Sequence, residues 1–259
     1  MRFGFLRAAL NIAALAGTIV VNWLSNALPL NGKSTEELSD LYPVLTTPAG
    51  YAFSIWGLIY LALIGFAVYQ ALPSQRSNPT IDRITPLFLV SCVANVGWLF
   101  TWHYELLLPN ILLMLMLLVT LIGIYRQLRA DGTPASTGER WLLRAPFSMY
   151  LGWITVATIV NLSTVLYAFG WRDVSMFGQL LAALLFVVAG VLGFSILRKF
   201  DDPVYTSVII WALVGVAVKQ SDSMLVAGTA LLVAVLLALS IAYRLVTRPA
   251  GEGRLSWLT

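Results

Sequence analysis

Residues 107–125 read LLPNILLMLMLLVTLIGIY, a run with no charged side chain. A helix rises about 1.5 Å per residue, so about 20 apolar residues cross the hydrocarbon core of a bilayer. The whole chain shares this character: 59% of its 259 residues are hydrophobic, 11% are charged, and the mean hydropathy is +0.84. Soluble domains have about 45–50% apolar and about 25% charged residues. The sequence therefore predicts an all-α integral membrane protein with little chain outside the bilayer.

Seven other stretches resemble this run in length and apolar character. Together they predict eight transmembrane helices, at about 8–28, 51–72, 85–103, 107–125, 145–168, 175–197, 204–218 and 223–243. The seventh is short, and two connections, 29–50 and 126–144, are longer than the rest. The first span resembles a signal peptide because Arg2 and Arg7 precede it. Its apolar run is long for a cleaved segment, so we expect it to be retained.

The basic residues test this eight-span arrangement. If the N-terminus is cytoplasmic and the spans alternate, the outer side receives only Lys33, Arg172 and Lys219 of the 16 lysines and arginines. Cytoplasmic loops are enriched in cations, so both termini are predicted to be cytoplasmic, and we expect a bacterial cell inner membrane. A cationic inner rim facing anionic lipid accounts for the net charge of +4, and no nucleic-acid partner is expected.

The interiors of the spans contain no Asp, Glu, Lys or Arg. Ionisable residues usually couple charge movement to transport within a membrane, so a proton-coupled carrier or pump is not indicated. The single histidine, His103, lies at a span end and is expected to be interfacial, with no Cys or second His beside it as a metal ligand. No Ser–His–Asp set or carboxylate pair can be assembled within the spans. We therefore expect neither an enzyme nor a metal site, and no obligatory cofactor.

Three spans instead carry a tryptophan at membrane depth beside a tyrosine or an asparagine. The three motifs are Trp56-x3-Tyr60, Asn95-x2-Trp98 and Trp153-x7-Asn161. Residues three or four apart share a helix face, and residues about two turns apart lie on overlapping faces. An amide is costly in lipid unless it is paired, and an indole N–H prefers the interface. The three faces therefore predict an internal cavity for a flat or bulky apolar ligand.

Helix packing is the alternative explanation for each polar residue taken alone. Amides within the spans include Asn11, Asn22, Asn95, Asn110, Asn161 and Gln179. Each could be a hydrogen bond between helices, worth about 0.6–2 kcal/mol. The stretch Gly190-Val-Leu-Gly193 is read as a close contact between helices. The remaining tryptophans, Trp102 among them, are read as interfacial anchors, and Trp211 is read as packing.

Prolines mark the ends of two connections. Pro48 ends the connection 29–50, directly before Gly50-Tyr51 and the second span. Pro109 lies in the first turn of the fourth span, where the missing N–H of proline is tolerated. The connection 29–50 is long enough to lie over the mouth of the cavity as a lid.

The tryptophan motifs, in this order, resemble the TspO/translocator protein family, also called tryptophan-rich sensory proteins. In that family the second helix begins after a proline pair and carries Trp-x3-Tyr, the third carries Asn-x2-Trp and the fifth carries Trp-x7-Asn. Here Pro48-x7-Trp56 opens the series. The resemblance covers about residues 1–170. It implies a five-helix bundle over 1–170, followed over 171–259 by three additional helices and a short basic tail.

The resemblance also implies a ligand and the residues that hold it. The family binds porphyrins, sterols and synthetic aromatic ligands in a pocket among its helices, so a porphyrin- or haem-type ligand is implied here. Pro48 and Tyr51 lie where the family has its proline pair and the tryptophan after it. Carried over, the residues that would line or support the pocket are Trp56, Tyr60, Asn95, Trp98, Trp153 and Asn161.

The chain departs from the family at several positions. The proline pair is reduced to Pro48, and Gly50 stands where a tryptophan is expected. In the fifth helix, Val165 and Met149 stand where the family has a tryptophan and a proline. The ligand therefore does not follow from the resemblance alone.

We expect a membrane receptor or carrier that holds an apolar aromatic small molecule, tetrapyrrole- or sterol-like, among its tryptophans. Its other expected partners are membrane lipid and, as an option, a second copy of the chain. One alternative is a facilitator or exporter of small metabolites, which would use the three extra helices for alternating access. Another is an enzyme that modifies a bound porphyrin with an indole as its redox or photochemical partner.

Overall fold

The computed structural model describes residues 2–28, 30–130 and 135–247, and this part of the chain contains helices and no β-strand. The predicted all-α membrane fold is confirmed. Seven helices or merged helical segments are long and apolar enough to span a bilayer, and the predicted seventh span is the shorter apolar helix α9. The long helices are α1 (Arg2–Ala27), α3 (Ile55–Ala71), α4 (Pro79–His103), α5 (Leu107–Gln127), α7 (Ala145–Ala168), α8 (Met176–Phe200), α9 (Pro203–Lys219) and α10 (Met224–Thr247).

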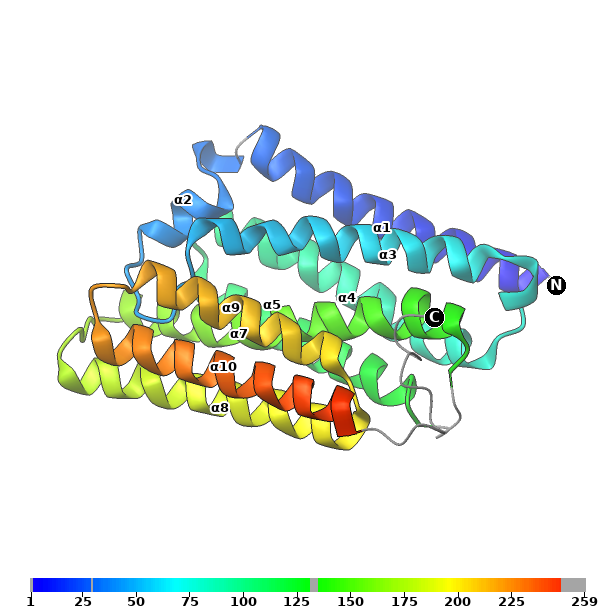
Figure 1. Cartoon of the computed structure of the whole chain (residues 1–259). Helices are drawn as coiled ribbons and strands as arrows, with labels where there is room; N and C mark the ends of the chain where they lie inside the picture. Colours follow the sequence, from blue (N-terminus) through cyan, green and yellow to red (C-terminus); the bar gives the residue numbers. More distant parts are fainter. Residues whose placement is uncertain (1, 29, 131–134, 248–259) are drawn as a thin grey trace.

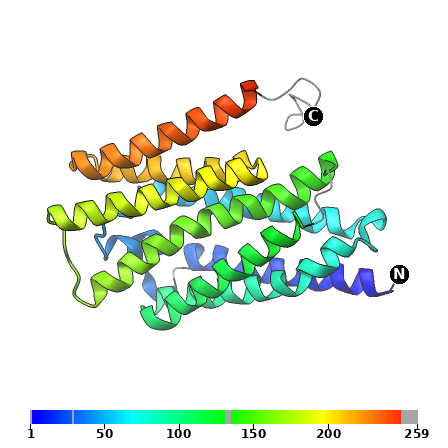
Figure 2. The same cartoon turned by 90° about the horizontal axis from the view of Figure 1, so that it is seen from below.

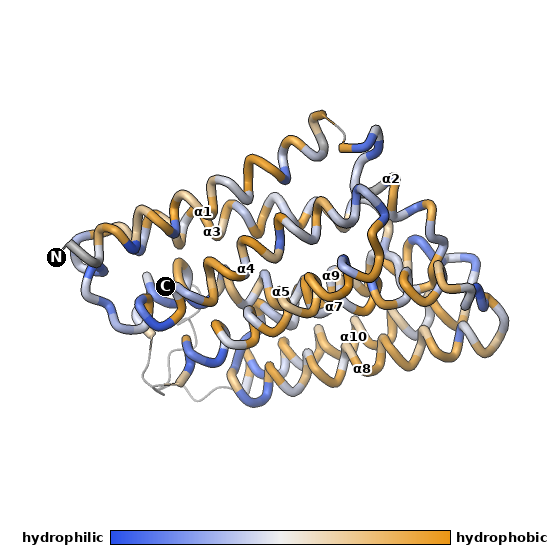
Figure 3. Tube along the Cα trace, turned by 180° about the vertical axis from the view of Figure 1, so that it is seen from behind, coloured by the Kyte–Doolittle hydropathy of each residue, from blue (hydrophilic) through white to orange (hydrophobic). Residues whose placement is uncertain are grey.

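Short helical turns fill the connections between these helices. They are η1 (Leu30–Gly32), α2 (Thr35–Asp40), η2 (Gly50–Ser54), η3 (Pro73–Gln75), α6 (Thr137–Glu139) and the π-helical turn η4 (Arg140–Arg144). Figure 1 shows the long helices running side by side, with α2 at one end of the bundle and the start of α1 at the other. Hydrophilic residues gather at the two ends and hydrophobic ones along the helices, as a bilayer requires (Figure 3).

The helices pack as two groups. In the first, α4 contacts α1 and α5, α7 contacts α5 and α3, and α1 contacts α3. In the second, α8, α9 and α10 pack on one another, and α9 joins the first group by packing on α7 (Figures 1 and 2). The predicted boundary at 170/171 falls in the α7–α8 connection, and residues 248–259 of the predicted second unit lie outside the described residues. We call α8–α10 the C-terminal unit.

A buried carboxylate joins the C-terminal unit to the rest of the bundle. Asp202 caps the start of α9, where its Oδ1 accepts the backbone N–H groups of Val204 and Tyr205 at 3.0 and 3.2 Å. Its Oδ2 accepts three further hydrogen bonds, from Arg129 (2.7 Å), Ser148 (2.6 Å) and Tyr125 (2.9 Å). A buried charge is tolerated when it is paired and fully hydrogen-bonded, so this cluster fixes α9 against α5 and α7.

The amides within the spans act mainly as contacts between helices, as the alternative explanation predicted. Each amide makes a hydrogen bond to a side chain or a backbone carbonyl outside its own helix, and such bonds link helices within a membrane. The pairs are Asn11 with Gln70 (2.7 Å), Asn22 with Asn95 (2.9 Å), Asn95 with Tyr150 (2.9 Å), Asn161 with Asn110 (2.6 Å), Asn110 with the carbonyl of Trp98 (2.8 Å), and Gln179 with Ser223 (2.9 Å).

The reading of Gly190 and Gly193 as a close helix contact is confirmed. A Cβ at Gly190 would collide with the side chain of Val233 on α10. The hydroxyl of Thr206 on α9 donates to the carbonyl oxygen of Gly193 at 3.0 Å. Small residues therefore let the three helices of the C-terminal unit approach closely.

Candidate functional site

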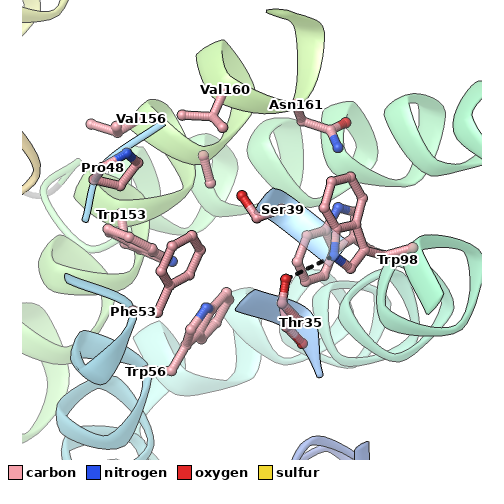
Figure 4. Close-up of a pocket in the computed structure, with 12 residues that line it drawn as sticks. Thr35, Ser39, Pro48, Phe53, Trp56, Trp98, Trp153, Val156, Val160 and Asn161 are labelled. Atoms are coloured by element: carbon pink, nitrogen blue, oxygen red, sulfur yellow. Dashed lines mark hydrogen bonds between the residues drawn. The ribbon is translucent and has the colours of Figure 1, made fainter. Parts of the chain in front are cut away.

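An aromatic cavity lies between α3, α4 and α7, near the end of the bundle that carries α2 (Figure 4). Three of its walls are helix faces, and Phe53 of η2 and residues from the 30–49 connection contribute the rest of the lining. The lining residues are Thr35, Ser39, Pro48, Phe53, Trp56, Trp98, Trp102, Trp153, Val156, Ala157, Val160 and Asn161. None of these carries a charge, so the cavity is an apolar space with a few hydrogen-bonding groups.

Indole rings form most of the cavity wall. The Trp56 ring lies 6.4 Å from Trp98 at an interplanar angle of 30°, and 6.3 Å from Trp153 at 81°. Trp102 stacks on Trp98 at 6.1 Å and 12°, and Phe53 meets Trp153 edge-on at 5.8 Å. These offset-stacked and edge-to-face arrangements are favourable, so the rings hold one another in place. The wall offers both ring faces and ring edges to a guest.

Three polar atoms of the lining residues are buried without a hydrogen-bond partner. They are the indole nitrogens Nε1 of Trp98 and Trp153, and the amide oxygen Oδ1 of Asn161. The Nδ2 atom of Asn161 donates to Asn110 at 2.6 Å, which holds the amide in place. Buried polar groups are nearly always satisfied, and an orphan costs about 1–3 kcal/mol. Two donors and one acceptor are therefore available to a guest in the cavity.

The cavity is small. Its volume is about 40 Å³, room for a few water molecules and not for a multi-ring ligand. Side chains from the 30–49 connection occupy one side, where Thr35 and Ser39 of α2 face the indoles (Figure 4). We call residues 30–49 the lid, and the end of the bundle that they cover the lid end. The predicted role of the 29–50 connection agrees with this placement.

Local sequence explains the shape of the lid. The hydroxyl of Ser34 accepts the backbone N–H of Glu37, and the Glu37 carboxylate accepts the N–H of Ser34, which is a capping box. That hydrogen bonding lowers the pKa of Glu37. Pro48 disfavours a helical conformation at the residue before it, so the chain stays extended until η2 begins at Gly50.

One edge of the lid is attached to the α4–α5 turn. Glu105 of this turn accepts hydrogen bonds from Tyr42 at 3.0 Å and from Lys33 at 3.3 Å. Burial and the hydrogen bond to Glu105 raise the pKa of Tyr42 to about 12. The indole N–H of Trp102 donates to the carbonyl of Thr35 at 3.4 Å. These contacts hold α2 over the indoles.

The opposite edge of the lid is attached to α9. Lys219 forms an ion pair with Asp40, and Gln220 donates to the carbonyl of Val44 at 3.5 Å. The backbone N–H of Ala49 donates to the carbonyl of Gly215 at 2.9 Å. The C-terminal unit therefore contributes one side of the cover over the cavity.

A family model described as a TSPO-like protein matches residues 8–243. The chain belongs to this family. The match extends beyond the motifs in residues 1–170 and takes in α8, α9 and most of α10. No curated protein and no solved structure matches the chain.

Five of the eight residues predicted for the site of this TSPO-like protein line the cavity together. They come from the lid, α3, α4 and α7, which are far apart in the sequence. The five residues are Pro48, Trp56, Trp98, Trp153 and Asn161.

The other three predicted residues lie outside the lining. Tyr60 stacks behind Trp56 at 5.6 Å, and Asn95 bonds to α1 and α7, so both support the indoles as the resemblance implied. Tyr51 is 45% exposed and packs edge-on against Trp211 at 5.3 Å. Tyr51 therefore lies outside the cavity lining, with its ring against α9, and its contact with a ligand stays a prediction.

Several lining residues were not predicted. Trp102 was read as an interfacial anchor, yet it is buried and stacked on Trp98. Its spacing of four from Trp98 was the available signal. Phe53 lies three residues before Trp56, but a 3-10 turn precedes α3 there, so helical spacing did not apply. Thr35 and Ser39 reach the cavity through the fold of the lid, which no periodicity reveals.

The TSPO-like chain offers no group for metal or acid–base chemistry at this site. Among the described residues there is no cluster of three His, Cys, Asp or Glu side chains that could hold a metal ion. His103 ends α4 and is buried, and its Nδ1 bonds to the Leu99 carbonyl at 2.8 Å. The arrangement suits binding through ring faces and a few hydrogen bonds.

Proposed function

We propose that the protein is a membrane receptor or carrier that binds a flat, apolar, aromatic small molecule in the cavity between α3, α4 and α7. The observation that carries this proposal is the pair of unpartnered indole N–H groups, on Trp98 and Trp153, in an otherwise apolar cavity. A ligand with an acceptor at its ring edge would satisfy them. Family membership supports a role in ligand binding or transport.

The chemistry of the lining favours a neutral ring system. Indole faces stack on aromatic and polyene surfaces, whereas no described cation faces the cavity to neutralise a carboxylate. A tetrapyrrole would therefore place its ring among the indoles and any carboxylates outside, toward the lid end. A sterol-like molecule would fill the same space but stack less well. The lining contains no His, Cys, Asp, Glu or Lys side chain, so binding without reaction is the simplest activity.

The lid has to move for such a ligand to enter. Pockets for drug-sized ligands measure about 300–1,000 Å³, while this cavity has about 40 Å³. Displacing Thr35 and Ser39 would enlarge it without disturbing the helices α3, α4 and α7. In the structure described here the lid lies over the cavity.

The orientation in the membrane follows from the cations. Among the described residues, Lys33, Arg172 and Lys219 are the basic side chains at the lid end, and the other lysines and arginines lie in the helix ends and connections at the opposite end. The positive-inside rule then places the lid outside and both termini in the cytoplasm. The ligand would reach the cavity from the outer side of the membrane.

Tryptophan fluorescence tests the proposal directly. Purified protein is titrated with protoporphyrin and with its uncharged dimethyl ester, and quenching is followed. We expect saturable quenching with both compounds. The ester should bind at least as tightly as protoporphyrin, because no cation in the cavity would pair with the carboxylates of protoporphyrin. Trp23→Phe serves as the control, since Trp23 is 65% exposed on α1 and far from the lining. Absence of saturable quenching with both compounds would contradict a tetrapyrrole site, and quenching lost only in Trp23→Phe would place the ligand on the outer surface.

A further inference from the structure

The C-terminal end of the lid rests on α9, next to residues that line the cavity. The Ala49 N–H donates to the Gly215 carbonyl at 2.9 Å, and the Trp211 indole N–H donates to the Ala52 carbonyl at 3.0 Å. Pro48 and Phe53, which line the cavity, flank these two attachment points. A shift of α9 would therefore move cavity residues directly.

Glycine at position 215 is what allows this contact. A Cβ built there would lie 3.0 Å from the Cβ atoms of both Pro48 and Ala52. That separation is shorter than an ordinary contact between side-chain carbons, so any larger residue has to push the lid or η2 away. The lid backbone meets the helix at this point because no side chain stands between them.

The helix α9, to which the lid is attached, is itself held by its neighbours. The start of α9 is locked to α5 and α7 through the buried Asp202 and Arg129, and Thr206 is bonded to α8. The Tyr205 hydroxyl also donates to Thr155 of α7 at 3.0 Å. The helix that carries Gly215 is therefore held on several sides and does not follow the lid.

The N-terminal part of the lid is attached more weakly. Lys33 and Glu105 are 40% and 39% exposed, and Asp40, the partner of Lys219, is 56% exposed. Exposed ion pairs contribute only about 0–1 kcal/mol each. These ion pairs therefore add little to the attachment of the α2 edge, which also rests on the burial of Leu38, whereas the segment at Pro48 and Ala49 is bonded to α9.

We infer that α9 anchors the C-terminal end of the lid, which acts as the hinge of the lid. Gly215 and Trp211 are then positioning residues that set how tightly the lid closes over the cavity. The C-terminal unit then controls access to a site that it does not line. This inference rests on the proposed function for its biological meaning, but lid opening can be measured with no ligand present.

Labelling of a cysteine placed in the lid measures that opening. Ser39 is buried and faces the cavity, and the single native cysteine, Cys92, is buried as well. In a Cys92→Ala, Ser39→Cys background, a maleimide reagent reacts only when the lid is open. We expect Gly215→Ala to raise the labelling rate about fivefold, because the new methyl group pushes Pro48 away. Trp211→Phe, which removes only the N–H and part of the ring, should raise it about twofold to threefold.

The matched control is Gly228→Ala on α10. Nothing lies within 4 Å of a Cβ at Gly228, so this substitution changes the same unit without touching the lid. Labelling that is equally fast in Gly215→Ala, Trp211→Phe and Gly228→Ala would overturn the inference. If the Gly215→Ala variant does not fold, the labelling rate of Trp211→Phe compared with that of Gly228→Ala still tests the inference.

Ligand kinetics separate this inference from the proposed function. With the protoporphyrin ester, a loosened lid should raise both the association and the dissociation rate. Faster labelling with no ester binding in any variant would uphold the hinge and contradict the ligand class. Normal ester binding with labelling unchanged by Gly215→Ala would uphold the ligand class and contradict the hinge.

Discussion

The helices α3, α4 and α7 each carry an aromatic residue at two levels of the bundle. At the level away from the lid these residues are Phe66, Phe88 and Phe147, whose rings meet edge-on at 5.1–5.8 Å and are fully buried. At the lid end they are Trp56, Trp98 and Trp153, whose rings lie 6.3–6.4 Å apart where the structure records a contact. The same three helices thus build two aromatic clusters, and the phenylalanine rings pack more closely than the tryptophan rings.

The difference lies in shape and in the indole N–H. Phenylalanine rings have no polar atom, so three of them close into a solid core with nothing left to satisfy. Indoles are larger and carry a donor, and here two donors stay without a partner while space remains between the rings. We interpret the phenylalanine cluster as the part that holds the bundle together and the tryptophan cluster as the part that binds.

The largest effect on stability is expected from Phe147→Ala. It removes a fully buried ring that contacts both Phe66 and Phe88. The cavity left behind should cost about 3 kcal/mol or more of unfolding free energy. Unfolding by denaturant in mild detergent measures this, and affinity for the protoporphyrin ester, measured under conditions where the variant is folded, should change little. A large loss of affinity without loss of stability would reverse the roles of the two clusters.

The second-largest expected effect is a loss of affinity for the ligand. Trp56→Ala removes the ring that lies between Trp98 and Trp153, so stacking with a ligand is lost. Affinity for the ester should fall about tenfold or more, which corresponds to about 1.4 kcal/mol. Titration calorimetry checks the value, with Trp23→Ala as the exposed control. Equal affinity in the two variants would remove the tryptophan cluster from the site.

A smaller effect is expected from Trp98→Phe, which keeps a ring and removes the unpartnered N–H. Loss of one hydrogen bond to the ligand should weaken binding about threefold to tenfold. The ligand-free protein should be equally or slightly more stable, because a buried donor without a partner disappears. Thermal unfolding with and without the ester separates the two effects. Lower stability in the ligand-free protein would show that the N–H already has a partner.

The smallest effect concerns pH. Burial and the neighbouring Glu105 raise the pKa of Tyr42 from its usual value of 10.0 to about 12. The contribution of this hydrogen bond to the closed lid is therefore complete below about pH 10 and is lost as the pH rises toward 12. Dissociation of the ester should become faster in this window, and Tyr42→Phe should make the rate independent of pH there. A wild-type rate that is flat from pH 9 to 12 would contradict the role of Tyr42 as a latch.

Much of this architecture could be predicted from the sequence, and the reasons are physical. Length and hydropathy identify spans because a bilayer demands them, so the helices from α1 to α10 were expected near their observed places. Helical spacing placed Trp56, Trp98, Trp153 and Asn161 on inward faces, and all four line one cavity.

The rest depended on contacts that are distant in the sequence. The bond from Ala49 to Gly215 and the burial of Trp102 under α2 follow from how the lid folds back, which no local pattern encodes. The position of Tyr51 could not be predicted for the same reason: its ring packs on Trp211 of α9, which is distant in the sequence, and not in the cavity lining. The role of the C-terminal unit was left open by the sequence for want of any motif there.

The structure of the protein with the protoporphyrin ester bound tests the central claim most directly. We predict the ring system between Trp56 and Trp153, an acceptor within hydrogen-bonding distance of the Trp153 Nε1 atom, and α2 displaced while Ala49 stays on Gly215. A ligand bound elsewhere, with the cavity as closed as it is now and both indole N–H groups still unpartnered, would contradict the account.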